Sequence, residues 1–298
     1  MNSDKVLQIN NLTKKYGNLR ALHNLSLQVQ KGSVYGLLGP NGSGKTTTLS
    51  IALGVLKPGS GNYYWFGEPP SCQSRLRIGS LIEESNFYPY LTLKDNLKIV
   101  AKIRNVPESD INKVLGLTNL LKRKYSRFAN LSSGLKKRLG LAAALLGDPD
   151  VLVLDEPTKS LDPEGFSDLR EIIKQQSEQE VTVILASHIL DEVEKVCSHV
   201  GILKAGELIR EGTVEDILGA SEIYYINSDE KEKLISVLAD SPMVKKYEQE
   251  KWGDIKVLLD SKYNASDLNR MTFSKKVVLS KLEVRKNTLE KEFLELIK

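Results

Sequence analysis

The sequence predicts an α/β protein built on a mainly parallel core sheet. An antiparallel β subdomain precedes the sheet, a helical subdomain is inserted into it, and a small α+β C-terminal domain follows. Three observations predict this arrangement. The glycine-rich loop "GPNGSGKTT" stands between an apolar strand and a helix. Two apolar runs, "VLVLD" and "VTVILAS", are typical of strands buried on both faces of a parallel sheet. Residues 91–130 carry Leu, Ile and Val at helical spacing.

Length and composition exclude several classes of protein. The chain has 298 residues, 41% hydrophobic and 27% charged, which is typical of a folded globular protein. No stretch reaches the roughly 18 apolar residues of a membrane helix, and the first ten residues form no secretion signal. Cys72 and Cys197 are too few for a disulfide framework or a metal site. The net charge of +4 comes from interspersed Lys, Arg, Asp and Glu, which is weak support for a nucleic-acid partner.

The first half of the chain alternates between strand and helix signals. Residues 5–36 alternate or run apolar between Gly and Asn turn signals, which predicts a strand-rich opening. The helical stretch 91–130 is expected to break at Pro107 and Gly116. We therefore expect an inserted helical subdomain at about residues 90–145.

The second half continues this alternation up to Gly219, after which a separate set of strand and helix patterns begins. Asp162 and Pro163 are suited to the cap and first turn of a helix between the two apolar runs. After Gly219, "EIYYIN", "IKVLLD" and "LEVRK" look like strands, whereas "EKEKLISVLA" and "TLEKEFLELIK" look like helices. We therefore expect one domain at residues 1–219 and a small α+β accessory domain at residues 220–298.

The loop at residues 39–47 has the spacing of a phosphate-binding loop: Gly, four residues, then Gly-Lys-Thr. Its glycines let successive backbone N–H groups face one anion, and the helix that follows adds the positive end of its dipole. Lys45 would reach the β- and γ-phosphates of a nucleotide, and the Thr46 hydroxyl would bind Mg²⁺.

The run "VLVLDEP", residues 151–157, ends a predicted buried strand in two carboxylates. Asp155 is placed to bind Mg²⁺ through water, and Glu156 to polarise the attacking water. His188 follows the next buried strand, where it could contact the γ-phosphate or orient that water. Because a phosphate-binding loop lies upstream, these roles are favoured over a solvated strand end and an ordinary polar histidine.

With these motifs in this order, residues 5 to about 218 resemble the ATP-binding-cassette (ABC) transporter ATPases, which have the fold of a P-loop NTPase cassette. "LSSGLKKR", residues 131–138, takes the place of the family signature, usually Leu-Ser-Gly-Gly-Gln. The resemblance implies that this loop covers the γ-phosphate held by the other subunit of a head-to-tail dimer with two ATP at its interface. The residues expected to make that contact are Ser132, Ser133 and Gly134.

The signature departs from the family pattern at two positions. Ser133 stands for Gly, and Leu135 stands for Gln. Ser132 and Gly134 keep a hydroxyl and an unobstructed backbone amide at a helix start. We therefore expect a working site in which Ser133 slows closure, and not a decayed one. The alternative for Ser132 is an ordinary helix cap.

Other positions follow from the same resemblance. Tyr16 matches the aromatic residue that stacks on adenine, with core packing as its alternative. Ser160 and Asp162, in "TKSLD", match the loop that faces the dimer partner. Glu83 takes the place of a glutamine that binds Mg²⁺, and a carboxylate can still ligate that ion. Glutamate there looks like the subset that serves lantibiotic-immunity and peptide-antibiotic exporters.

Besides the signature-loop and dimer-loop residues, the expected site residues form three groups, with ATP and Mg²⁺ as the expected cofactors. The catalytic residues are Glu156 and His188. The nucleotide-binding residues are Tyr16, Gly39, Pro40, Asn41, Gly42, Ser43, Gly44, Lys45, Thr46 and Thr47. The Mg²⁺ ligands are Thr46, Glu83 and Asp155.

The resemblance implies an ATP-hydrolysing subunit of an exporter, working as a homodimer or heterodimer of cassettes that drives separate permease subunits. It would be cytoplasmic and peripheral on the inner face of the cell membrane. One alternative is a cassette ATPase acting on nucleic acid or ribosomes, but the long coiled coils or second cassette of such members are missing. The other is a nucleotide-gated scaffold, against which Glu156 and His188 argue.

Overall fold

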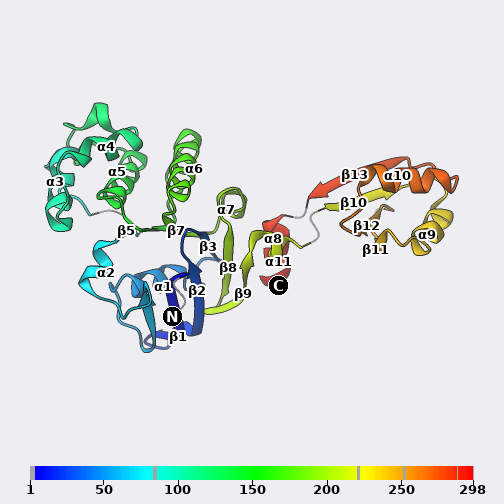
Figure 1. Ribbon diagram of the computed structural model, residues 1–298, viewed down its shortest axis with the longest axis horizontal. Coiled ribbons are helices and arrows are strands. Elements are labelled where there is room, and N and C mark those ends of the chain that lie inside the picture. Colours follow the sequence, from blue (N-terminus) through cyan, green and yellow to red (C-terminus); the bar gives the residue numbers. More distant parts are fainter. Residues whose placement is uncertain (1–3, 83–85, 220–221, 251–252, 287, 298) are drawn as a thin grey trace. The chain divides into compact units, whose positions relative to one another are not determined.

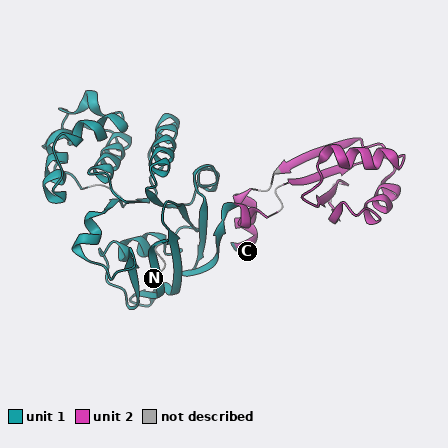
Figure 2. Ribbon diagram, in the orientation of Figure 1, with its two compact units in different colours: residues 1–214, 297 teal, residues 215–296, 298 magenta. Residues whose placement is uncertain are grey.

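The computed structural model describes residues 4–82, 86–219, 222–250, 253–286 and 288–297 (Figure 1). The chain divides into two compact units (Figure 2). The first runs through Val214 and includes Ile297, and the second runs from Glu215 to Leu296. The sequence analysis placed the division after Gly219. None of the described helices is long and apolar enough to cross a bilayer.

The first unit is built on a six-stranded sheet in the order β5-β6-β7-β3-β8-β9. Neighbouring strands are parallel except for the antiparallel pair β8 and β9. Every residue of β3, β6 and β7 is buried, which confirms that the apolar runs are covered on both faces. The strands are β3 (Val34–Leu38), β5 (Ile78–Leu81), β6 (Val151–Asp155), β7 (Thr182–Ser187), β8 (His199–Lys204) and β9 (Glu207–Thr213).

A three-stranded antiparallel sheet in the order β2-β1-β4 forms the predicted β subdomain. Its strands are β1 (Lys5–Tyr16), β2 (Leu19–Gln30) and β4 (Ser60–Trp65). The buried apolar residues of β1 and β2 form one cluster with Trp65. The Trp65 indole N–H donates to the carbonyl of Ala52, 2.6 Å away, at the end of helix α1 (Lys45–Ala52). This bond joins the subdomain to the helix that follows the phosphate loop.

Three further helices accompany the core sheet: α2 (Cys72–Leu76), α6 (Pro163–Glu178) and α7 (Leu190–Val196). The cap predicted for α6 is confirmed, because Asp162 Oδ1 accepts a hydrogen bond from Gly165 N at 2.8 Å and Pro163 occupies the first helical position. This cap fixes the residue at which the loop after β6 ends and α6 begins.

The helical subdomain contains α3 (Leu93–Arg104), α4 (Asp110–Leu117) and α5 (Ser133–Leu145), grouped together in Figure 1. The predicted breaks are confirmed, because the chain leaves the helical conformation around Pro107, between α3 and α4, and α4 ends at Leu117, one residue after Gly116. The predicted helix ends early, because residues 118–130 form only two 3₁₀ turns, Leu121–Arg123 and Phe128–Asn130.

Arg104, the last residue of α3, connects this subdomain to the core. Its guanidinium donates to the carbonyls of Leu146 at 2.8 Å, Ile78 at 3.1 Å and Ala144 at 3.2 Å. Burial lowers the pKa of this guanidinium, and the three carbonyls accept three of its five N–H donors. One side chain therefore joins α3 to the end of α5 and to β5.

Replacing Arg104 by methionine should lower the free energy of unfolding by about 2–4 kcal/mol, because three buried carbonyls lose a charged donor. Urea unfolding followed by circular dichroism measures this change. Lys102→Met, at an exposed position of the same helix, is the control and should stay within about 0.5 kcal/mol of the unchanged protein. Equal urea midpoints of unfolding for the two variants would show that the Arg104 hydrogen bonds do not stabilise the helical subdomain.

The second unit has the order β10-α9-β11-β12-α10-β13, and its antiparallel sheet has the order β11-β12-β10-β13. This is the ferredoxin-like βαββαβ arrangement. The sequence analysis missed β11, whose residues are mostly polar, and α10. The elements are α8 (Val214–Leu218), β10 (Glu222–Asn227), α9 (Lys231–Ala239), β11 (Val244–Gln249), β12 (Ile255–Leu259), α10 (Ala265–Ser274), β13 (Lys281–Lys286) and α11 (Leu289–Ile297).

Candidate nucleotide-binding and catalytic site

The predicted phosphate loop connects the end of β3 to the start of α1, as the sequence requires. Gly44 adopts φ of +106°, and a Cβ at this position would lie 2.8 Å from the carbonyl oxygen of Ala21. A Cβ on Gly39 would lie 2.5 Å from the carbonyl oxygen of Leu203. Only glycine fits at these two positions, because β2 and β8 pack directly against the loop.

The loop has unused hydrogen-bonding groups that suit an anion. Ser43 Oγ is buried and has no hydrogen-bond partner in the described part of the chain. The amides at the start of α1 have no acceptor within the helix, and its dipole favours negative charge there. The sequence-predicted residues 39–47 are therefore brought together in a form that fits the phosphates of a nucleotide.

Lys45 lies at the centre of this loop with its charge buried. Its Nζ donates to the carbonyl of Gly39 at 2.7 Å and of Pro40 at 3.3 Å, and it lies 3.8 Å from Glu156 Oε1. Burial lowers the pKa of Lys45, while the charges of Glu156 and Asp155 act in the opposite direction. The ammonium group is thus held between the phosphate loop and the end of β6.

Thr46 and Asp155 form the pair of oxygens that could hold Mg²⁺. The Thr46 hydroxyl donates to Asp155 Oδ2 at 2.7 Å, and Asp155 Oδ1 is buried without a partner among the described residues. Burial raises the pKa of Asp155, whereas the hydrogen bond from Thr46 and the charge of Lys45 lower it. A bound divalent cation would also lower this pKa, because it favours the charged carboxylate.

Two protein oxygens are few for a metal ion. No group of three or more His, Cys, Asp or Glu side chains suited to a metal occurs in the part of the chain that the structure describes. Mg²⁺ commonly uses one or two carboxylates together with substrate phosphates and water, so the donor set fits that ion. The third predicted ligand, Glu83, lies outside the described residues.

Glu156 is held in position by His188 and by its own backbone. His188 Nδ1 lies 2.7 Å from Glu156 Oε2, and Glu156 N donates to the carbonyl of Ala186 at 2.9 Å. Glu156 adopts φ of +45°, an unusual conformation for a residue with a side chain. The strained backbone places the carboxylate beside Lys45 and His188, which brings the two predicted catalytic residues together.

The signature loop and the loop after Glu156 lie beside each other within one chain. A Cβ on Gly134 would lie 3.1 Å from the carbonyl oxygen of Ser160, which has φ of +71°. Ser133 and Ser160 line an open cleft of about 730 Å³ that also reaches Thr46, Asp155 and Glu156. One predicted signature residue, Ser133, therefore shares a cleft with two predicted metal ligands, Thr46 and Asp155.

Ser132 and Tyr16 each had a simpler alternative role. Ser132 does cap α5, because its hydroxyl accepts from Leu135 N at 3.4 Å, and this leaves its own O–H free to donate to an anion. Tyr16 ends β1 with 45% of its surface exposed, so core packing is wrong for this residue. An exposed ring is compatible with the predicted stacking on adenine.

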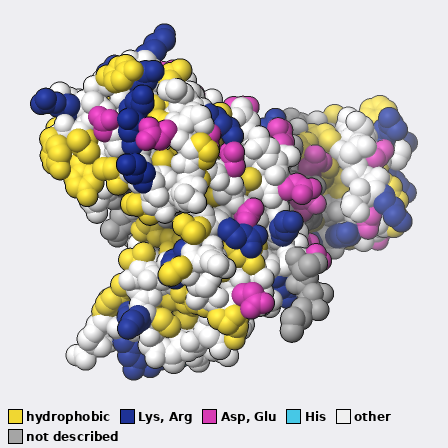
Figure 3. Space-filling model, turned by 60° about the vertical axis from the view of Figure 1, so that its left-hand side comes forward, with side chains coloured by type: hydrophobic (Ala, Val, Ile, Leu, Met, Phe, Trp, Pro, Cys, Tyr) yellow, Lys and Arg dark blue, Asp and Glu magenta, His cyan; other side chains and the backbone are white. Residues whose placement is uncertain are grey.

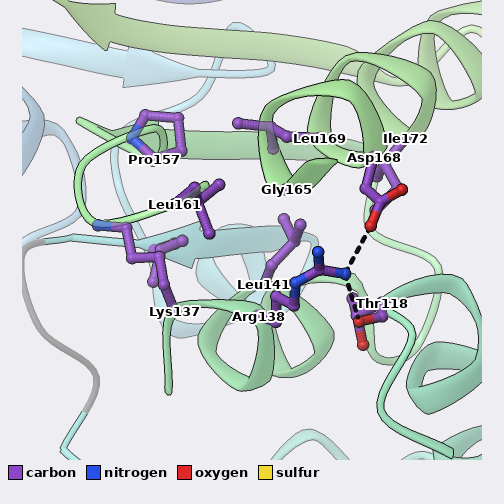
Figure 4. A pocket seen from close by; sticks show the side chains of 11 residues that line it. Thr118, Lys137, Arg138, Leu141, Pro157, Leu161, Gly165, Asp168, Leu169 and Ile172 are labelled. Atoms are coloured by element: carbon purple, nitrogen blue, oxygen red, sulfur yellow. Dashed lines mark hydrogen bonds and ion pairs between the residues drawn. The ribbon is translucent and has the colours of Figure 1, made fainter. Parts of the chain in front are cut away.

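Sequence reasoning missed two contacts that join α5 to the catalytic strand and α6. Lys137 Nζ donates to the carbonyl of Asp155 at 3.4 Å. The Arg138 guanidinium lies 2.5 Å from Asp168 (Figure 4). The Asp168 carboxylate also accepts a hydrogen bond from Asn119 Nδ2 at 2.9 Å. Figure 4 shows this pair beside the apolar side chains of a small pocket. No spacing in the sequence relates Arg138 to Asp168, because they come from different helices.

A phosphate loop, a threonine bonded to a buried aspartate, and a glutamate held by a histidine together define a nucleoside triphosphatase of the P-loop class. Comparison with known proteins narrows this class. The family model described as ABC transporter matches residues 22–159.

Two relatives match beyond this core. The bacitracin transport ATP-binding protein BcrA of Bacillus licheniformis is 34% identical over 98% of this chain and 97% of its own length. The lantibiotic transport ATP-binding protein SrtF of Streptococcus pyogenes is 40% identical over 74% of this chain and 96% of its own length. The chain therefore belongs to the ABC transporter family of ATP-binding proteins.

Solved structures agree with this assignment. An ATP-binding subunit of an ABC transporter matches with a TM-score of 0.66 and 27% identity, over 71% of this chain and 91% of that one. A dimeric post-hydrolysis cassette bound to ADP and Pi matches with a TM-score of 0.63 and 25% identity, over 70% of this chain and 98% of that one. The fold predicted from the sequence is confirmed, and the chain is an ATPase of this family.

Proposed function

We propose that this ATPase drives export through separate membrane permease subunits, as a head-to-tail dimer with two ATP at its interface. The observation that carries the hydrolytic part is Glu156, held between Lys45 and His188 directly after the Thr46-bonded Asp155. The non-hydrolysing scaffold is disfavoured, because a scaffold has no need of a strained glutamate beside a histidine.

Each residue of the site has a distinct role in this proposal. The loop amides and Ser43 bind the phosphates, and Lys45 turns from its loop carbonyls to the β- and γ-phosphates. Thr46 and Asp155 hold Mg²⁺, which when bound neutralises charge on the phosphates. Glu156 accepts a proton from the attacking water, and His188 fixes the orientation of the Glu156 carboxylate.

A dimer explains the open cleft. Ser133 and Ser160 line it, and both are exposed in the single chain. The partner's signature loop would complete the phosphate site, and Asp162, which caps α6, would hold the loop that faces the partner. The solved cassette described as dimeric with ADP and Pi supports this arrangement.

Export is supported by the names of the relatives. Bacitracin and lantibiotic transport are the activities for which BcrA and SrtF are named. We infer a cargo of that peptide-antibiotic class and a cytoplasmic position on the inner face of the membrane. The second unit, residues 220–298 in the sequence analysis, would be an accessory domain without chemistry of its own.

Purification of the tagged chain from detergent-solubilised membranes tests this function. An integral membrane protein should copurify, and peptide antibiotic should stimulate ATP hydrolysis by the complex. Copurification of RNA or ribosomes without a membrane protein would favour the nucleic-acid alternative instead.

Replacing Ser133 by glycine should leave ATP turnover equal or higher, because the serine Cβ and hydroxyl obstruct the dimer seam in this proposal. Phosphate release under saturating ATP measures turnover. Ser133→Ala is the matched variant, since it removes the hydroxyl and keeps the Cβ. A marked loss of turnover in both variants would show that the hydroxyl takes part in the site.

A further inference from the structure

Five buried side-chain polar atoms have no hydrogen-bond partner in the part of the chain that the structure describes. Buried polar groups are normally hydrogen-bonded, so each exception needs a physical reason. Two of the five, Ser43 Oγ and Asp155 Oδ1, belong to the proposed phosphate and Mg²⁺ sites. The other three are Thr158 Oγ1, Arg170 Nε and Glu192 Oε2. The last two differ from the Thr158 hydroxyl because they lie close to each other.

Arg170 and Glu192 form an ion pair between two helices of the first unit. Arg170 lies on α6 and Glu192 on α7, and these helices contact each other (Figure 1). Arg170 Nε lies 3.3 Å from Glu192 Oε2, and Lys195 Nζ lies 3.6 Å from Glu192 Oε1. Because neither facing atom has a hydrogen-bond partner among the described residues, the Nε–H of Arg170 is not aligned with the carboxylate. The pair still draws the helices together, since the attraction between charges depends on their distance.

Burial of the facing atoms distinguishes this pair from the ion pairs at the surface. Figure 3 shows Lys, Arg, Asp and Glu side chains on the surface of the molecule. In the Lys113–Asp148 pair, for example, the two side chains are 55% and 73% exposed, and exposed pairs of this kind contribute little. Removing one partner of a buried pair leaves the other charge unpaired, which has a larger effect. Loss of Arg170 or Glu192 should therefore disturb the contact between α6 and α7.

The two helices follow directly on the two proposed catalytic residues. α6 comes after the loop that begins at Glu156, and α7 begins just after His188. His188 Nδ1 in turn lies 2.7 Å from Glu156 Oε2. The chain and the two contacts thus form a closed ring, in which α6 leads from Glu156 to Arg170 and α7 leads from Glu192 back to His188. A shift of α7 against α6 would change the distance between His188 and Glu156.

We propose that Arg170 and Glu192 are positioning residues for ATP hydrolysis. By linking α6 to α7, they hold His188 at the distance from Glu156 at which it orients that carboxylate. This inference rests on the proposed function, in which Glu156 accepts a proton from the attacking water. Both residues lie outside the groups assigned to phosphate, metal and water, so their loss should affect the chemical step and leave nucleotide binding unchanged.

Steady-state ATP hydrolysis by the full chain tests the proposal. Arg170→Gln and Glu192→Gln should each lower kcat by about tenfold, because small misplacements of catalytic groups slow the chemical step. KM for ATP should stay unchanged, since the phosphate loop is intact. The double variant should be no slower than the single variants, because either change alone breaks the pair. Arg170→Lys keeps the charge and should retain more turnover than Arg170→Gln.

Matched controls separate the pair from the general charge of the two helices. Lys174→Gln on α6 and Asp191→Asn on α7 change exposed residues and should keep full turnover. Thermal unfolding shows whether each variant is folded. The pair variants should remain folded, because Leu190 and Val193 are buried and continue to pack α7 against the core.

The imidazole of His188 reports its position directly. In protein labelled with ¹⁵N-histidine, the ring resonances of His188 are assigned through their loss in His188→Gln. These resonances should shift in Arg170→Gln and in Glu192→Gln, and they should stay in place in the two control variants. A purely structural ion pair would lower thermal stability without this shift and without a loss of kcat.

Glu156→Gln distinguishes failure of this inference from failure of the proposed function. Slow turnover by Glu156→Gln, together with full turnover by folded Arg170→Gln and Glu192→Gln, would overturn the inference and leave the proposed function standing. Unchanged His188 resonances in both pair variants would also overturn it. Full turnover by Glu156→Gln would overturn the proposed function, and the inference with it.

Discussion

Replacing Glu156 by glutamine should lower kcat for ATP hydrolysis by about 10²- to 10⁴-fold, the usual contribution of a positioned general base. Glutamine keeps the size of the side chain and can still contact His188, which lies 2.7 Å from the carboxylate. It cannot accept a proton from the attacking water. ATP affinity should stay close to that of the unchanged protein, because the phosphate loop and the Thr46–Asp155 pair are intact. Phosphate release and nucleotide titration measure the two quantities.

The effect should be specific to this carboxylate. Glu178→Gln, an exposed position at the end of α6, is the control and should keep full turnover. His188→Gln should lower kcat less than Glu156→Gln, because His188 acts by orienting the glutamate. Turnover by Glu156→Gln equal to that of the unchanged protein would mean that another group accepts the proton from the water.

Replacing Lys45 by alanine should weaken ATP binding by about 10- to 100-fold, since hydrogen bonds to charged groups contribute roughly 1.5–3 kcal/mol. The Lys45 ammonium is already desolvated and held by the carbonyls of Gly39 and Pro40. It therefore gives up little hydration when it turns to the phosphates. Fluorescent nucleotide titration measures the loss of affinity.

Two controls accompany this variant. Lys31→Ala removes an exposed charge close to β3 and should leave affinity unchanged. Thermal unfolding shows whether the alanine variant remains folded, because Gly39 O loses its donor from Lys45. A folded Lys45→Ala protein with the affinity of the unchanged chain would contradict the assignment of the phosphate loop.

The sequence predicted those parts of the fold that depend on local chemistry. The phosphate loop, the buried strands β6 and β7 and the Asp162 cap each follow from residue types at fixed spacing. Because Asp155, Glu156 and His188 follow predicted buried strands downstream of that loop, the sequence also predicted that they act on the same nucleotide.

Features that depend on tertiary contacts could not be predicted in this way. The pairing of Arg138 with Asp168 joins residues 30 positions apart on two helices. The edge strand β11 has too few apolar residues to show a strand pattern.

The measurement that tests the central claim most directly is the molar mass of Glu156→Gln by light scattering, with and without Mg-ATP. A functional cassette with "LSSGLKKR" as its signature should be a monomer without nucleotide and a dimer with Mg-ATP. A monomer in both conditions, with ATP binding intact, would contradict closure of Ser133 and Gly134 over the partner's phosphate.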